Sequence, residues 1–135
     1  MKIIKLEGDR AWPPMVTEVT KPFWDGLREG SFKSTQCNAC DRMTFPPKML
    51  CPHCWSRDLR WSEFSGTGTL YSRTTVYFTP EVFQRLAPLE VGIVDLDENI
   101  RIACAVVGSK LPLDSKVRLV TLMYDDGPLF GVEPA

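Results

Sequence analysis

Four cysteines in two Cys-x-x-Cys pairs constrain the fold of this chain more than any other feature. Cys37 and Cys40 form the first pair, Cys51 and Cys54 form the second, and ten residues separate the pairs. Pairs at this spacing can place four sulfurs around one ion, and Zn²⁺ accepts a closed tetrahedron of thiolates. Because such a site has no open coordination position, we expect a structural and not a catalytic metal. The sequence therefore predicts a zinc ribbon with one structural Zn²⁺ per chain.

Two other uses of the same cysteines are possible from the sequence. Disulfides need an oxidising compartment, and the start of the chain, Met1–Glu7, is too short and too charged for a secretory signal. A rubredoxin-like iron site uses the same four ligands, and the ligands alone do not separate iron from zinc. His53 lies inside a complete four-thiolate set, so we expect it to be a solvated side chain.

The fifth cysteine has a different setting. Cys104 sits in the apolar run 102–107, where a buried and inert thiol is expected. Free thiols, metal thiolates and the absence of a secretory signal together favour the cytoplasm.

Composition places the chain among ordinary globular proteins. Its 135 residues are 44% hydrophobic and 24% charged, with a net charge of −1. This length supports one compact domain, or a small domain with a metal-stabilised appendage. The apolar runs are far shorter than the roughly 20 residues that cross a bilayer, and the charge gives no basic excess for a phosphate backbone. We therefore expect neither a membrane nor a nucleic-acid partner.

Residues 1–30 are predicted to form an N-terminal arm and a helix. The paired prolines after Trp12 forbid a helix over 1–15 and favour an extended arm. Thr20 can cap a helix, Pro22 suits a first helical turn, and Gly30 can end it. These signals predict a short amphipathic helix over about 18–29.

An aromatic pair on this helix has two possible roles. Phe23, Trp24 and Leu27 fall on one face. The face can be a lid on the ribbon, or it can anchor a partner, since aromatic residues are enriched at interface cores. Phe23 and Trp24 are therefore candidate partner-binding residues.

The predicted ribbon covers residues 31–64. Short strands are expected over 31–36 and 59–64, and Pro46 and Pro47 confine the segment after Met43 to an edge or an extended exit. Basic side chains exceed acidic ones by three over 28–60, but four thiolates around one Zn²⁺ partly cancel that excess.

Strand signals dominate the predicted third domain, residues 65–135. β-Branched and aromatic runs alternate with turn residues, and Gly66 and Gly68 indicate a bulge or bend. Strands are expected over 70–79, 90–97, 100–107, 116–123 and 129–132, with one or two helical turns over 80–86. The count and spacing favour a closed five-stranded barrel of the OB type. The predicted fold class is mainly β: an N-terminal helix, a rubredoxin-like zinc ribbon and a C-terminal five-stranded OB-fold barrel.

The ordered set of motifs resembles a known family, the small acyl-CoA-associated subunits with an N-terminal helix, a zinc ribbon and an OB-fold. The resemblance covers about residues 20–134. The motifs that carry it are Pro22-Phe-Trp-Asp-Gly-Leu-Arg-Glu-Gly30, Cys37-x-x-Cys40, Phe45-Pro-Pro-Lys-x-x-Cys51-Pro-x-Cys54, Trp61-x-x-Phe-Ser-Gly-x-Gly-Thr-Leu-Tyr71, and Pro88 followed by Val91-Gly-Ile-Val-Asp-Leu-Asp97. Two positions depart from the family pattern: Trp55 and Ser115 stand where the family usually has glycine.

The resemblance implies a supporting role. Members of this family partner thiolase-like proteins, among them thiolases, acyltransferases and thiolase-like aldolases, and the partner supplies the catalytic cysteine and histidine. The small subunit bridges proteins and can line the route of the CoA arm at the shared interface. The resemblance thus implies a hetero-oligomer in which this chain is a non-catalytic accessory subunit.

The residue content of the chain also argues against a catalytic site of its own. A nucleophile needs a base within reach, and the one histidine, His53, lies inside a metal knuckle. The acidic residues Glu81, Glu90 and Asp95 are scattered and form no paired-carboxylate motif.

A single-stranded nucleic-acid-binding module is the alternative function. Zinc ribbons and OB barrels can bind single strands through basic grooves and stacked aromatics, and Tyr71, Tyr77, Phe78 and Arg73 could supply such contacts. Against it, residues 87–135 have eight acidic and four basic side chains. A groove that follows phosphates needs the opposite balance.

Overall fold

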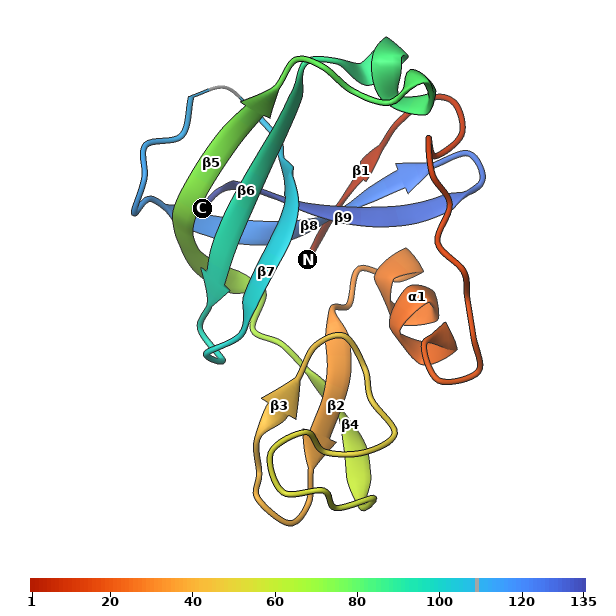
Figure 1. Ribbon diagram of the computed structural model, residues 1–135, viewed down its shortest axis with the longest axis vertical. Coiled ribbons are helices and arrows are strands. Elements are labelled where there is room, and N and C mark those ends of the chain that lie inside the picture. The colour runs from red at the N-terminus through yellow and green to blue at the C-terminus, as the bar shows by residue number, and fades with distance from the viewer. Residues whose placement is uncertain (109) are drawn as a thin grey trace.

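The computed structural model describes residues 1–108 and 110–135. Ser109, between the strands expected over 100–107 and 116–123, lies outside the described residues. Figure 1 shows the barrel above, the zinc-ribbon sheet below and the helix beside their junction. The elements in chain order are β1 (Lys2–Lys5), α1 (Lys21–Arg28), β2 (Lys33–Cys37), β3 (Met43–Thr44), β4 (Leu59–Glu63), β5 (Thr67–Val76), the 3-10 helix η1 (Glu81–Leu86), β6 (Leu89–Leu96), β7 (Arg101–Val106), β8 (Lys116–Tyr124) and β9 (Gly127–Pro134).

The strands after residue 65 close into a barrel, as predicted. Antiparallel pairs join β5 to β6, β6 to β7, β5 to β8 and β8 to β9. A short parallel pair between β7 and β9 completes the ring. A β-bulge between Leu70 and Ser72 bends β5, which lets one long strand pair with β8 near its start and with β6 along its length.

The N-terminal arm contributes a strand that the sequence did not predict. β1 runs parallel to β8, from Lys2 opposite Val120 to Lys5 opposite Met123. On that side of β8, the pairing with β5 covers only Thr67 to Thr69. β1 therefore continues the ladder along β8 where β5 has turned away, and so covers an edge that would otherwise be exposed.

The ribbon is a small antiparallel sheet with β2 between β3 and β4. Thr35 of β2 lies opposite Thr44 on one side and Trp61 on the other. β3 and β4 are the edge strands, and Pro46 lies two residues after the end of β3, outside the ladder, as expected for a residue that cannot donate to it.

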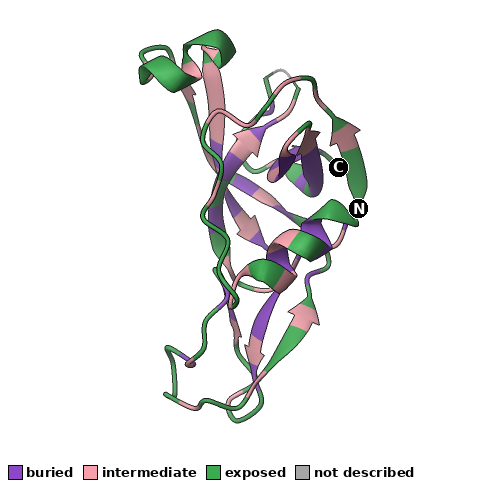
Figure 2. Ribbon diagram, turned by 90° about the vertical axis from the view of Figure 1, so that its right-hand side faces the viewer, coloured by how far each residue is buried: buried purple, intermediate pink, exposed green. Residues whose placement is uncertain are grey.

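An aromatic cluster joins the helix, the ribbon and the barrel. Phe23 of α1 contacts Phe32 before β2 and Phe130 of β9, with ring centroids 5.2 and 6.0 Å apart. Phe45 and Phe64 complete the cluster. Figure 2 shows buried residues in the barrel, on α1 and at the base of the ribbon, and these belong to one hydrophobic cluster. The division into residues 1–30, 31–64 and 65–135 therefore stays a prediction, and the three segments share one hydrophobic core.

Candidate metal centre

The structure brings the four predicted cysteine ligands together. The sulfurs of Cys37, Cys40, Cys51 and Cys54 all lie within 4.8 Å of one another. The Cys37–Cys54 and Cys40–Cys51 sulfur–sulfur distances are 3.5 and 3.6 Å. Four thiolates about 2.3 Å from a tetrahedral zinc stand about 3.8 Å apart. The geometry of the donor set therefore fits a closed tetrahedral metal site.

The two cysteine pairs have the same backbone construction. In the first, the Asp41 amide donates to the Cys37 carbonyl over 2.9 Å; in the second, the Trp55 amide donates to the Cys51 carbonyl over 2.9 Å. Asp41 and Trp55 both have a left-handed backbone, with φ of 65° and 67°. Each turn thus reverses just after its second cysteine, which points both sulfurs of a pair in one direction.

Backbone N–H groups favour the thiolate form of the first cysteine. The amides of Cys40 and Ala39 lie 3.4 and 3.3 Å from the Cys37 sulfur. The Cys40 amide lowers the pKa of Cys37 to about 6, and burial opposes this effect. A thiolate is the form that binds metal. In the same cluster the Ser56 amide favours the Cys54 thiolate, but the hydrogen bond with Cys37 and burial outweigh it and raise the pKa of Cys54 to about 12. The preference for a thiolate therefore belongs to Cys37 and is not shared by Cys54.

Polar side chains brace the first knuckle. Arg60 of β4 donates to the Asn38 side-chain oxygen over 2.6 Å and to Asp41 over 2.8 Å. The Asn38 amide group donates in turn to Asp58 over 2.9 Å. The sequence analysis missed this brace, because pairing between β2 and β4 brings Arg60 to the knuckle from 23 residues away in the chain.

His53 lies on the surface of the second knuckle. Its Nδ1 is 3.3 Å from the Arg42 guanidinium, and both side chains are exposed. This position agrees with the expected solvated side chain.

The two candidate partner-binding residues have different exposures. Phe23 is only 2% exposed and belongs to the aromatic cluster. It cannot touch a partner without leaving the core. Trp24 is partly exposed and packs edge-on against Phe23 at 4.9 Å between ring centroids. A partner-binding role for these residues stays a prediction, and only Trp24 is accessible enough for direct contact.

The remaining cysteine lies in the barrel. Cys104 of β7 is 8% exposed, and burial raises its pKa to about 12. The thiol is therefore protonated and weakly nucleophilic near neutral pH, as predicted from its apolar run.

Comparison with known protein families agrees with this architecture. The profile described as "ChsH2, rubredoxin-like zinc ribbon domain" matches residues 24–60, and the profile described as "ChsH2, C-terminal OB-fold domain" matches residues 61–122. The chain belongs to the ChsH2 zinc-ribbon and OB-fold family. This assignment agrees with the resemblance that the sequence motifs indicated, and with a metal site at the four cysteines.

A solved structure of the family has the same fold over almost its entire length. The match is to the "Ltp2-ChsH2(DUF35) aldolase", with a TM-score of 0.79, 28% identity, and coverage of 90% of this chain and 98% of that chain. A DUF35 protein of unknown function from Sulfolobus solfataricus matches with a TM-score of 0.60 at 18% identity. This second likeness concerns the fold alone.

Curated relatives have names of scaffold proteins and of enzyme subunits. A "DUF35 domain-containing scaffold protein" from Methanothermobacter thermautotrophicus is 28% identical over 69% of this chain and 71% of its own length. The "Benzoylsuccinyl-CoA thiolase subunit BbsA" from Thauera aromatica is 30% identical over 57% of this chain and 52% of its own. The "3-oxo-4,17-pregnadiene-20-carboxyl-CoA hydratase alpha subunit" from Mycobacterium tuberculosis is 27% identical over 96% of this chain and 42% of its own. The chain thus spans about half the length of the latter two relatives.

One further property concerns membranes. Within the part of the chain that the structure describes, no helix has both the length and the apolar character to cross a bilayer.

Proposed function

We propose that this chain is a non-catalytic accessory subunit that binds a thiolase-like enzyme. The observation that carries the proposal is the likeness to a chain of the Ltp2-ChsH2 aldolase, which extends over 98% of that chain. The relatives named as a scaffold protein and as a thiolase subunit support the same role. On this proposal the complex is a hetero-oligomer, and the CoA arm of the substrate lies at the shared interface.

The metal in this proposal is one structural Zn²⁺ per chain. Its ligands are Cys37, Cys40, Cys51 and Cys54. The tetrahedral spacing of the sulfurs supports a closed site without a position for substrate. Bound zinc would hold the two knuckles together and would supply folding free energy to the ribbon.

The positions of the remaining nucleophile and base support a non-catalytic role. Cys104 is buried in β7 of the barrel, and its raised pKa keeps the thiol protonated. His53 lies at the metal centre and contacts Arg42. Nucleophilic catalysis needs a base within hydrogen-bond reach of the nucleophile. Cys104 lies in a barrel strand, whereas His53 is exposed on the second knuckle of the ribbon, and the two share no hydrogen bond in the described residues.

The contacts of two residues weigh against the nucleic-acid alternative. The Arg101 guanidinium stacks over the Tyr71 ring at 3.8 Å and also pairs with Asp95. Arg73 donates to the Leu111 carbonyl and lies near Glu90. In the nucleic-acid alternative, Tyr71 would stack on a base and Arg73 would contact a phosphate, but both side chains already have partners within the chain.

Co-expression with a thiolase-like enzyme tests the proposal. The chain is expected to co-purify with the enzyme, to turn over no acyl-CoA alone, and to raise the turnover of the mixture above that of the isolated enzyme. Correct positioning of reacting groups can change a rate by on the order of 100-fold. Substantial turnover by this chain alone, lost in Cys104→Ala, would show that it is an enzyme.

Substitution of Trp24 tests the predicted docking face. Trp24→Ala is expected to lower co-purification more than it lowers the melting temperature, since the side chain is partly exposed beside the core. Trp61→Ala is the matched control, because Trp61 is 37% exposed on the ribbon strand β4. A large fall in melting temperature with normal binding by the folded fraction would make Trp24 a core residue only.

A further inference from the structure

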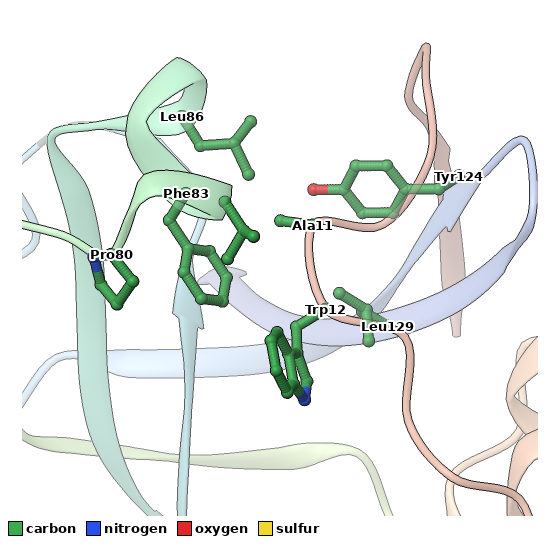
Figure 3. Close-up of a pocket in the computed structure, with 8 residues that line it drawn as sticks. Ala11, Trp12, Pro80, Phe83, Leu86, Tyr124 and Leu129 are labelled. Carbon is green, nitrogen blue, oxygen red and sulfur yellow. The ribbon is translucent and has the colours of Figure 1, made fainter.

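An apolar hollow lies at the end of the barrel far from the metal centre. It has a volume of about 550 Å³, within the range of small-molecule sites. The N-terminal arm, η1, β8 and β9 contribute its walls. Figure 3 shows side chains from these segments facing a common space. They include Trp12, Pro80, Phe83, Leu86, Tyr124 and Leu129.

A second apolar chamber adjoins the first. It has a volume of about 260 Å³ and shares Phe83, Leu86, Tyr124 and Leu129 with the outer hollow. It extends to Cys104 on β7, beside the seam where the parallel pairing of β7 and β9 is limited to two residue pairs. The hollow therefore continues from the surface toward the barrel wall.

Hydrogen bonds hold the arm in place over this hollow. Gly8 and Asp125 exchange two of them: the Gly8 amide donates to the Asp125 carboxylate over 3.0 Å, and the Asp125 amide donates to the Gly8 carbonyl over 2.9 Å. The Arg10 amide donates to Asp126 over 2.8 Å, and the Arg10 guanidinium donates to the carbonyls of Asp126 and Pro128. Arg85 of η1 donates to the Asp9 carbonyl and ties the arm to the opposite wall. The hollow is therefore preformed.

The charged side chains around the hollow have partners within the chain, except that one oxygen of Glu90, in the lining of the inner chamber, is buried without a hydrogen-bond partner among the described residues. Arg10 pairs with Asp126, and the Glu90 carboxylate accepts from Thr75 over 2.6 Å and lies 3.7 Å from Arg73. Tyr124 supplies a polar atom, a hydroxyl that points into the hollow in Figure 3. The lining is therefore mostly apolar, with the Tyr124 hydroxyl and the Glu90 oxygen among its polar atoms, and it favours an uncharged occupant over an anion.

We propose that this hollow binds the hydrocarbon part of an acyl thioester, a chain or ring system without charge. The assignment to an acyl group rests on the proposed function, in which the partner enzyme holds the CoA arm. The apolar class of the occupant rests on the lining alone. The inner chamber, lined by strands and η1, has a volume of about 260 Å³, which admits a hydrocarbon group but not a polypeptide helix about 10 Å in diameter.

Calorimetric titration of the zinc-loaded chain with decanoyl-CoA, CoA and 1-decanol tests this site. Decanoyl-CoA and decanol are expected to bind, and CoA is expected not to bind. Val82→Asp places a carboxylate in the lining at a residue that is 44% exposed, so folding should tolerate it. The Val82→Asp variant is expected to bind decanoyl-CoA and 1-decanol at least tenfold more weakly than the wild-type chain does. Met49→Asp is the control, since Met49 is 71% exposed on the ribbon and should leave binding unchanged.

A filling variant provides an independent check. Ala11→Phe adds a ring to the arm wall and is expected to reduce binding of both hydrocarbon probes without adding charge. Equal binding of the probes to wild type, Val82→Asp and Ala11→Phe would overturn the proposal, as would the absence of hydrocarbon binding. Equal binding of CoA and decanoyl-CoA, or binding of decanol without decanoyl-CoA, would overturn the assignment to an acyl group.

Partner capture by the same variants separates this proposal from the proposed function. If the wild-type chain captures the enzyme but binds neither hydrocarbon probe, only the hydrocarbon site is contradicted. Hydrocarbon binding without capture of any thiolase-like enzyme contradicts only the accessory role. A third outcome is that the wild-type chain binds no hydrocarbon probe and Val82→Asp no longer captures the enzyme. The hollow would then be a protein interface, and the proposal would be overturned.

Discussion

The knuckles at Cys37 and at Cys51 share one backbone geometry and have different surroundings. Both end in a left-handed residue whose amide returns to the carbonyl of the first cysteine. The first knuckle continues β2, which pairs on both sides, and Arg60 braces it. The second lies in irregular chain between β3 and β4.

This difference shows which parts of a metal site the protein prepares in advance. Sheet pairing and the brace hold the first knuckle, so that its geometry depends little on the metal. The second knuckle has few interactions besides its own turn and depends on the ion for its position. Structural zinc sites commonly couple binding to folding, and here we expect the coupling to concentrate in the second knuckle.

The largest expected effect comes from loss of a ligand. Cys51→Ser should abolish zinc binding and expose the amides of residues 50–57 to hydrogen exchange, because structural zinc sites contribute about 10 kcal/mol or more. The amides of β2 should keep partial protection through their pairing with β4. Exchange mass spectrometry and metal analysis measure both effects. Equal loss of protection in the two knuckles would contradict the difference drawn between them.

A smaller effect is expected from removal of the brace. Arg60→Ala removes a donor to the Asn38 side-chain oxygen and to the Asp41 carboxylate, while the Cys37 carbonyl keeps the Asp41 amide. Groups that orient metal ligands typically contribute 10- to 100-fold in affinity, and for this exposed group we expect about tenfold weaker zinc binding in competition with a chelator. Arg57→Ala is the matched control, since Arg57 is an exposed arginine between the second knuckle and β4. Equal losses in the two variants would indicate a general charge effect.

The smallest effect concerns the two left-handed residues. Trp55→Gly should raise the free energy of unfolding by about 1 kcal/mol, because a bulky side chain is strained at a φ of 67°. Asp41→Gly should gain less, since Asp tolerates this conformation better and its carboxylate pairs with Arg60. Urea unfolding of both zinc-loaded variants measures the difference. A loss of stability in Trp55→Gly would show that the exposed indole makes a stabilising contact.

Local signals in the sequence predicted most of the fold and the metal centre. The cysteine spacing indicated the ligand set, and the β-branched runs indicated the barrel strands and the insertion that contains η1. Trp55 stands where the family usually has glycine, and its backbone is left-handed in the structure. These features depend on residues near one another in the chain, where periodicity and turn chemistry give direct information.

The features that were not predicted depend on distant pairings. β1 is a short, lysine-flanked segment whose partner strand begins more than a hundred residues later. The Arg10–Asp126 pair and the Arg60 brace consist of common surface residue types without a local motif. Phe23 was expected on a face that was either a lid on the ribbon or a partner anchor, and the choice was open because the burying rings come from the ribbon and from β9.

The position of β9 in the barrel has a consequence for synthesis on the ribosome. β9 lies between β7 and β8, and its Val132 is fully buried. The barrel cannot close until residues 127–134 have left the exit tunnel, whereas the four cysteines and β2 to β4 emerge about 70 residues earlier. The nascent chain can therefore acquire its metal while the barrel strands are still unpaired. Synthesis of β9, and not the metal, then sets how long the open strand edges of the barrel stay exposed to aggregation.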